Sequence, residues 1–228
     1  RGDYFFIGDS ENEQQQLIES VELMKNHGFE SSYMASQQEL ESFNIKQATA
    51  ARGCRLSAQI NPAKFRNQLL KHLIDRGLKY HSYKVTDLNQ NGLSTTATYH
   101  DQTTSTHDAM VIAGNAYSPL FSKFFKQKKL VEPFKGQIIV SKPMKQKVKR
   151  ASWSRDHGYI YGTITEDNRV LIGGWRNNIE GGETGTYDLE LNKQISIGLR
   201  EYVETHFDFE PLEFEYEWTG RMGTSNTG

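Results

Sequence analysis

The sequence predicts a mixed fold of the α+β or α/β class, and three patterns support this prediction. Capped helices with apolar residues on one face begin near residues 61 and 186. Three strand-like segments separated by turn residues lie between residues 79 and 113. A short apolar run at 109–113 then ends at Gly114, and such a run between turn residues is typical of a strand buried on both faces.

Composition limits the class of protein. The chain has 228 residues, with 27 Lys plus Arg against 28 Asp plus Glu, so its formal net charge is −1. Balanced charge argues against a general nucleic-acid binder. The single cysteine, Cys54, excludes an intrachain disulfide framework and favours a reducing compartment. No apolar run reaches the roughly 20 residues of a membrane helix, so we expect a cytoplasmic protein without membrane contact.

The ends of the sequence suggest a larger parent. It opens on Arg1 rather than Met, directly before a strand-like segment at 4–7, and it stops in a turn-like segment at 224–228. We expect a piece of a longer protein, with sequence on both sides.

The first 60 residues predict a strand at 4–7, two helices and an extended segment at 52–60. Asp9 or Ser10 caps the first helix, which Gly28 ends, and Ser36 begins the second. Asn61 and Pro62 then start a helix. Its predicted buried stripe consists of Phe65, Leu69, Leu70, Leu73 and Ile74.

A β-meander follows, with strands predicted at 79–85, 92–99 and 107–113, and then a short helix at 117–125. Later strands are predicted at 137–140, 148–153, 159–164, 170–173 and 214–218. Thr186 or Asp188 opens a long helix between the last two, with the stripe Leu191, Ile195, Leu199, Tyr202 and Val203. The helix and meander at 61–117 thus form a unit enclosed by sequence of a different type.

The order of these motifs resembles the D-amino-acid-oxidase-like flavoprotein superfamily, in particular the branch of glycine, sarcosine and γ-glutamylputrescine oxidases. The matching segments are 57–62, 111–118, 136–138, 159–174 and 217–220, which together span nearly the whole chain. Each motif alone is weakly specific, but the ordered set is more so.

The resemblance implies a two-domain, FAD-dependent oxidoreductase acting on an amine or amino acid. It assigns residues 1–60 and 118–218 to a mixed-sheet substrate domain, 61–117 to the FAD domain, and 219–228 to the return toward that domain. It also implies cofactor contacts at six positions, which are Val85, Ala113, Gly114, Trp218, Gly220 and Arg221.

One departure from the family is clear. The family's Gly-x-Gly-x-x-Gly fingerprint, which places a helix N-terminus at the pyrophosphate, occurs nowhere in the sequence. The family's last strand and helix are expected after Gly228. We therefore expect this chain alone to bind FAD weakly or not at all.

Candidate catalytic residues are Tyr159, Tyr161 and Arg176. Flavin amine oxidation needs no strong protein base, so the protein orients the substrate. The two tyrosines alternate along a strand and could enter one cavity, or they could simply cover a half-dry sheet face. Arg176 could clamp a carboxylate in a bidentate manner, or form a surface salt bridge.

Other features predict less. The seven histidines form no metal-binding pattern, and Cys54 lacks an adjacent base. The glycine-rich segment 181–185 predicts a mobile loop, a possible lid. Two alternative functions stay open: a non-enzymatic recognition or interaction module, and a single-stranded nucleic-acid binder using the basic segments 123–129 and 142–150.

Overall fold

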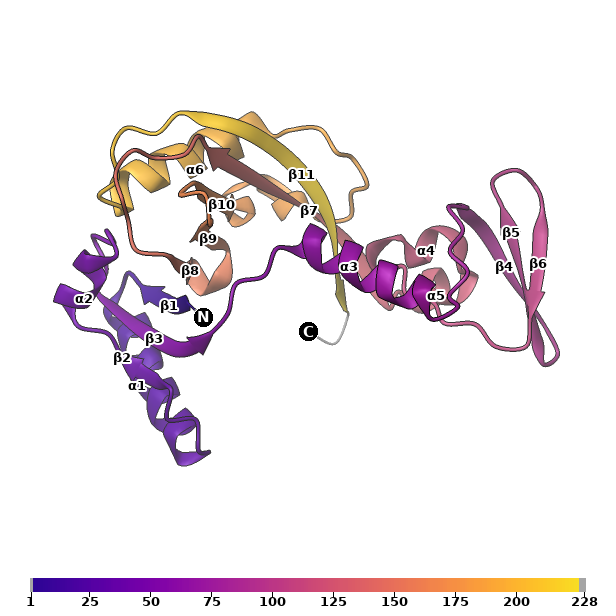
Figure 1. The fold of residues 1–228 in the computed structure, drawn as a ribbon, viewed down its shortest axis with the longest axis horizontal. Helices are drawn as coiled ribbons and strands as arrows, with labels where there is room; N and C mark the ends of the chain where they lie inside the picture. The colour runs from indigo at the N-terminus through magenta and orange to yellow at the C-terminus, as the bar shows by residue number, and fades with distance from the viewer. Residues whose placement is uncertain (1, 226–228) are drawn as a thin grey trace. The chain divides into compact units, whose positions relative to one another are not determined.

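The computed structural model describes residues 2–225, and the chain divides into two compact units (Figure 1). Unit 1 comprises residues 1–59, 136–183 and 189–220, and unit 2 comprises residues 60–135, 184–188 and 221–228. Residues 226–228, part of the predicted final segment, lie outside the described residues.

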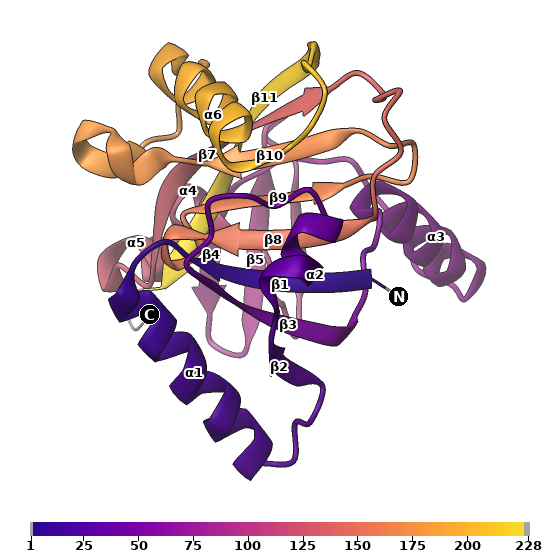
Figure 2. The ribbon, with the colours of Figure 1, turned by 90° about the vertical axis from the view of Figure 1, so that its left-hand side faces the viewer.

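Unit 1 is built on an eight-stranded sheet in the order β11-β7-β10-β9-β8-β1-β3-β2 (Figure 2). The strands are β1 (Gly2–Gly8), β2 (Ser32–Met34), β3 (Ala50–Ser57), β7 (Val131–Ser141), β8 (Ala151–Arg155), β9 (Ile160–Ile164), β10 (Val170–Gly174) and β11 (Phe214–Ser225). All of the strands predicted in these regions are therefore present, with β7 and β11 longer than predicted.

The centre of the sheet is a parallel pair. β1 runs parallel to β8, with Phe5 opposite Trp153 and Phe6 opposite Ser154, and antiparallel to β3 on its other side. Because successive side chains of a strand point to opposite faces, Phe5 and Trp153 share one face and Phe6 and Ser154 share the other.

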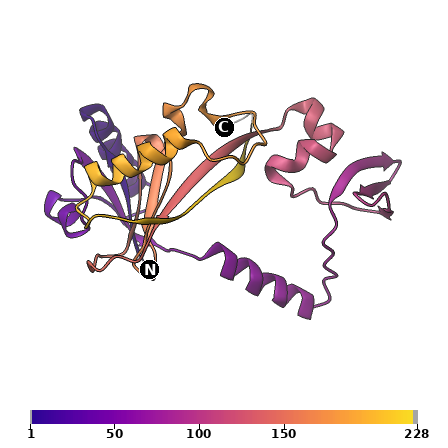
Figure 3. The same ribbon diagram turned by 90° about the horizontal axis from the view of Figure 1, so that it is seen from above.

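The hydrophobic core lies on the Phe5 face, against helix α6 (Lys193–His206), which runs along the sheet (Figure 3). Its predicted stripe is largely confirmed, since Ile195, Leu199 and Val203 are buried. The predicted start at Thr186 or Asp188 is wrong. Asn192 caps the helix instead, by accepting a hydrogen bond from the Gln194 N–H at 3.0 Å.

Helix α1 (Glu11–Asn26) covers the opposite face. Its N-cap is Ser10, as predicted. Arg52 of β3, which lies opposite Phe6 on this face, donates to Ser20 Oγ in α1 at 2.9 Å. Gly8 allows the helix to approach the end of β1, because an added Cβ would lie 2.9 Å from the Glu13 Cβ. Helix α2 (Gln37–Ser42) begins after Ser36, as predicted.

Unit 2 contains helix α3 (Pro62–Asp75), capped by Asn61 as predicted. The predicted buried stripe is wrong, because no residue of α3 is buried: Phe65 is 56% exposed and Leu69 44%. The amphipathic pattern predicted the helix correctly, yet the described residues supply no surface that covers its apolar side.

The meander of unit 2 is a three-stranded sheet in the order β4-β5-β6 (Figure 1). Its strands are β4 (Val85–Asn91), β5 (Ser94–Tyr99) and β6 (Thr104–His107). The first and third strands thus lie several residues from the predicted 79–85 and 107–113. The pairs that close the two turns are Asn91 with Ser94 and Thr98 with Thr104, and these pairs set where the strands lie.

The apolar run 109–113 is not a strand, so this prediction is wrong. Val111 is 91% exposed, and no strand among the described residues pairs with the run. An extended segment becomes a strand only when a neighbouring backbone pairs with its N–H and C=O groups. The chain continues through a 3₁₀ turn (Asn115–Tyr117) into α4 (Ser118–Phe121) and α5 (Lys123–Lys128). Within the described residues, no helix is long and apolar enough to cross a bilayer.

Gln137 provides a test of how unit 1 is held together. Its side chain, 1% exposed, donates from Nε2 to the Glu217 carboxylate at 2.8 Å and to the Asn192 carbonyl at 3.1 Å, and its Oε1 accepts from the Asn192 N–H at 2.8 Å. Gln137→Leu leaves these buried groups unpaired, so we expect the free energy of unfolding to fall by about 2–3 kcal/mol. Urea denaturation measures this loss, and the exposed Gln194→Leu should change it by less than about 0.5 kcal/mol. Equal effects would contradict the role of Gln137.

Candidate active site

The face of the unit 1 sheet opposite the core carries a group of hydroxyl side chains, which we call the hydroxyl face. Strands β8 and β9 pair so that Ser152 lies opposite Thr163 and Ser154 opposite Tyr161. The intervening residues, including Trp153 and Ile160, are buried in the core. The sheet therefore has one apolar and one polar face, and the sequence shows this as hydroxyl residues at every second position.

The pairing register extends this face across five strands. Tyr161 lies opposite Gly173 of β10 and Ser154 of β8, Ser154 lies beside Phe6 of β1, and Phe6 lies opposite Arg52 of β3. The order across the sheet is therefore Gly173, Tyr161, Ser154, Phe6 and Arg52. Such a row is defined by register alone, and sequence reasoning could not find it.

Gln59 fixes the neighbouring hydroxyls. Its Nε2 donates to Ser152 Oγ at 3.0 Å and to Thr163 Oγ1 at 2.7 Å, and its Oε1 accepts from Arg150 at 2.9 Å. Sequence reasoning missed Gln59, because a polar residue before the Asn61 cap resembles an ordinary loop position.

A strained corner at the end of β10 positions Arg176. Gly174 has φ +108°, and an added Cβ would lie 1.8 Å from the Tyr159 carbonyl oxygen. Trp175, also left-handed with φ +65°, donates its N–H to that same oxygen at 2.8 Å. The indole of Trp175 lies flat on α6 at Gly198, where an added Cβ would approach it to 2.4 Å. Backbone strain of this kind clusters at functional sites.

The corner brings the three predicted catalytic residues together. The guanidinium of Arg176 lies over the Tyr159 ring, 5.2 Å from its centroid, and donates to the Gly182 carbonyl at 3.0 Å. Burial raises the pKa of the Tyr161 phenol, and the positive charge of Arg176 partly opposes this rise. Two phenols and one guanidinium thus share a small region, able to bind an anionic group and donate hydrogen bonds.

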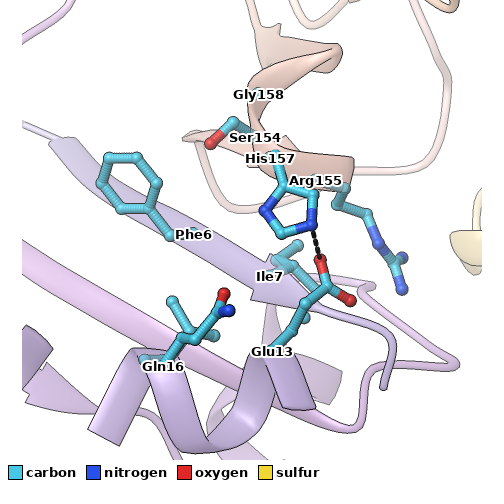
Figure 4. A pocket seen from close by; sticks show the side chains of 10 residues that line it. Phe6, Ile7, Glu13, Gln16, Ser154, Arg155, His157 and Gly158 are labelled. Carbon is cyan, nitrogen blue, oxygen red and sulfur yellow. Dashed lines mark ion pairs between the residues drawn. The ribbon is translucent and has the colours of Figure 1, made fainter. Parts of the chain in front are cut away.

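A cavity of about 260 Å³ borders the hydroxyl face beneath α1 (Figure 4). Phe6, Ser154 and His157 line it from the sheet side, and Glu13 and Gln16 from the helix. The sequence drew attention to none of these residues, because the β1–β8 pairing and the packing of α1 against the sheet bring them together.

The predicted cofactor residues of unit 1 lie in β11. Trp218 is 44% exposed, and Gly220 has no atom within 4 Å of an added Cβ. The backbone at Gly220 is therefore open to the approach of another group.

Among the predicted cofactor residues of unit 2, Val85 begins β4 half-buried and Ala113 is exposed. Gly114 is close-packed: an added Cβ would lie 2.8 Å from the Phe121 ring. Arg221 donates from Nε to the Tyr187 carbonyl at 2.6 Å and from Nη1 to the Tyr117 hydroxyl at 3.1 Å. Of these residues, Ala113 is open to a dinucleotide, whereas Gly114 is close-packed and Arg221 is hydrogen-bonded within the chain. The sequence holds no Gly-x-Gly-x-x-Gly cradle for a pyrophosphate.

The structure adds no support for the other two candidate sites, a metal site and a nucleic-acid-binding surface. Within residues 2–225, no group of three His, Cys, Asp or Glu could hold a metal ion. Three basic side chains of segment 142–150 have partners in unit 1, since Lys142 pairs with Glu213, Lys149 donates to Ser42 and Arg150 donates to Gln59.

Comparisons with known proteins give a consistent result. The family model described as FAD dependent oxidoreductase (DAO) matches residues 1–228. No curated protein sequence matches the chain.

Many solved structures share the fold, and three of them illustrate it. A glycine oxidase from Geobacillus kaustophilus matches with TM-score 0.82 and 18% identity, over 100% of this chain and 60% of its own. An L-proline dehydrogenase from P. horikoshii matches with 0.79 and 16%, over 96% and 60%. An L-α-glycerophosphate oxidase from Mycoplasma pneumoniae, with FAD bound, matches with 0.74 and 13%, over 98% and 62%. The predicted two-domain oxidoreductase fold is confirmed, and the chain spans about three-fifths of these proteins.

The corner at Gly174 generates one prediction. In Gly174→Ala the new methyl group clashes with the Tyr159 carbonyl in addition to the cost of a positive φ, so we expect a loss of stability of more than about 3 kcal/mol. Gly181→Ala is the matched control, because Gly181 has φ +74° but no atom within 4 Å of an added Cβ. The control should lose only about 1 kcal/mol. Thermal unfolding measures both, and equal losses would show that the close approach to Tyr159 is not a constraint.

Tyr161 generates a second prediction. Because burial raises the pKa of its phenol in the folded state, the folded protein keeps a proton that the unfolded chain releases above a pH of about 10. Its stabilising effect is complete below that pH and decreases above it. We therefore expect Tyr161→Phe to lose less stability than the wild type between pH about 9 and 11, measured by urea denaturation. Tyr216→Phe, at a tyrosine 52% exposed, is the control and should follow the wild type.

Proposed function

Since the chain belongs to the FAD-dependent oxidoreductase family, whose model matches residues 1–228, we propose that the protein oxidises a C–N bond of an amine or amino acid. The substrate carbon transfers hydride to the flavin, and the resulting imine hydrolyses in water. The flavin supplies the electron acceptor, and the residues of this chain bind and orient the substrate.

The grouping of Tyr159, Tyr161 and Arg176 carries the proposal. Arg176 is held over Tyr159 at 5.2 Å, and its charge acts on Tyr161. A planar guanidinium matches a carboxylate in a bidentate manner, and the Tyr161 phenol stays protonated, so it can donate a hydrogen bond. In our proposal Arg176 binds the carboxylate of an amino acid while the tyrosines orient its amino-bearing carbon.

The proposal gives each unit a role. Unit 1, with the hydroxyl face, is the substrate domain. Unit 2 is part of the FAD domain, in which Val85 and Ala113 approach the cofactor through their backbone. The exposed run 109–113 and the uncovered apolar side of α3 support this role, because both leave surface available for further structure. Residues 118–135, which the resemblance assigned to the substrate domain, lie in unit 2.

The proposal that the protein oxidises a C–N bond is more specific than the shared fold alone implies. The glycine oxidase and L-proline dehydrogenase are named for amino acids, whereas the glycerophosphate oxidase is named for a phosphorylated alcohol. The hydroxyl face favours an amine, because hydroxyl oxygens and aromatic rings both interact favourably with an amino group.

The role of Arg176 can be tested with the whole protein loaded with FAD. We expect Arg176→Gln to lower kcat/KM for amino acids by about 10–100-fold, the loss of a charge-assisted hydrogen bond. Amines of the same length without a carboxylate should lose much less. Anaerobic bleaching of the visible flavin band measures both, whatever the natural acceptor is. Equal losses for the two substrate classes would remove the carboxylate clamp from the proposal.

The expected weak cofactor binding can be tested with the 228-residue chain itself. Because the sequence lacks the pyrophosphate fingerprint, adding FAD to the purified chain should leave the flavin spectrum as in free solution. A stable, shifted flavin band would contradict this expectation and show that the chain holds the cofactor by itself.

A further inference from the structure

The cavity beneath α1 has an apolar part and a polar part (Figure 4). Phe6, 37% exposed, and Leu17 provide apolar surface. Glu13, Gln16, Ser154 and His157 add polar groups, and in Figure 4 the side chains of Phe6, Gln16, Glu13 and His157 surround a common space. The volume, about 260 Å³, suits a small ligand or one end of a longer one.

Among residues 2–225, no hydrogen-bond donor reaches one of the two carboxylate oxygens of Glu13. Glu13 Oε2 accepts from the Asp9 N–H at 2.9 Å and from the Ser10 hydroxyl at 3.1 Å. Glu13 Oε1 lies 3.9 Å from His157 Nε2, which is too long for a hydrogen bond. The side chain is 16% exposed and lines the cavity, so this oxygen is available to a ligand there.

The charges around the cavity favour a cation. Arg155 also lines it, but its guanidinium binds Asp9 and the Gln47 carbonyl and lies over the Tyr202 ring of α6. Its positive charge is therefore directed to the core side of the sheet, where it pairs with Asp9, while its Nη1 is buried without a hydrogen-bond partner among the described residues. Because the Arg155 guanidinium lies over Tyr202 on the core side, the charged side chain at the helix wall of the cavity is the Glu13 carboxylate, which would repel an anionic ligand.

The cavity lies on the same side of the sheet as the proposed catalytic tyrosine. Phe6 and Tyr161 belong to one cross-strand row and are separated by Ser154 alone. Neighbouring strands lie about 4.8 Å apart, so about 10 Å separates Phe6 from Tyr161. An extended chain of several bonds can span this distance.

We propose that the cavity binds a protonated amino group at the far end of the substrate, with Glu13 Oε1 and the Gln16 side-chain carbonyl as acceptors and Phe6 and Leu17 against the alkyl chain. The substrate class is then a diamine, or an amine with a distal cationic group. This assignment of substrate rests on the proposed function, whereas the binding of an alkylammonium group in the cavity does not.

The binding step can be tested on the purified chain without any cofactor. The probes are butylamine, 1-butanol and butyrate, which share a four-carbon chain and differ in the charge of their end group. Shifts of the Gly8 and Gly158 amide NMR signals, at two glycines that line the cavity, report the site and the affinity. We expect butylamine to bind, 1-butanol to bind at least about tenfold more weakly, and butyrate not to shift these signals.

Two variants distinguish ligand binding in the cavity from binding to the exposed surface of α1. Glu13→Gln keeps the side chain that caps α1 but removes its charge, so it should weaken butylamine binding about tenfold. Glu11→Gln, in the same exposed first turn but outside the cavity, should leave the affinity unchanged. Equal effects of the two variants, or a stronger shift with butyrate than with butylamine, would overturn the proposal.

The outcome is independent of the flavin chemistry. If butylamine binds and Glu13→Gln weakens its binding, the cavity is an alkylammonium site even when the FAD-loaded protein oxidises no amine. Only the proposed function is then wrong. If the FAD-loaded protein oxidises amines but prefers monoamines to diamines of equal length, the assigned substrate class is wrong while the proposed function remains.

Discussion

The parallel pairing of β1 with β8 is the constraint on which the candidate site depends. It joins residues 2–8 to residues 151–155, nearly 150 positions later, and sets Phe6 beside Ser154. Because side-chain direction alternates along each strand, this register decides at once which residues enter the core and which line the hydroxyl face. A slip of one residue would place Phe6 in the core and Phe5 among the hydroxyls.

The two faces of the sheet then have different roles. On one face Phe5, Trp153 and α6 form a dry core that fixes the strands. On the other, hydroxyl groups and Gln59 form a polar surface, bordered by the Gly174 corner on one side and by the Glu13 cavity on the other. Rigid support on one face and polar groups on the other is the arrangement that a substrate-binding site needs.

Much of this fold could be predicted from local pattern, and the rest could not. Ser10, Ser36 and Asn61 were predicted as helix caps because capping depends on residues close in sequence. The run 109–113 and the α3 stripe were predicted as buried because apolar residues usually find a partner surface, and the described residues offer none. Asn192, which caps α6 through the nearby Gln194 N–H, was missed because Thr186 and Asp188 just upstream are also residue types that cap helices. Tyr161 and Arg176 were predicted as candidates, but Glu13 and Phe6 were not, since only the β1–β8 register brings them to the same face.

In the proposed reaction, a substrate held on the hydroxyl face transfers hydride from its amino-bearing carbon to the flavin. The most direct measurement is rapid anaerobic mixing of the FAD-loaded whole protein with an amine or amino acid that carries either hydrogen or deuterium at that carbon. We expect the flavin band to bleach, and to bleach more slowly with deuterium than with hydrogen. Absence of bleaching by any amine or amino acid, together with bleaching by alcohols, would contradict this expectation.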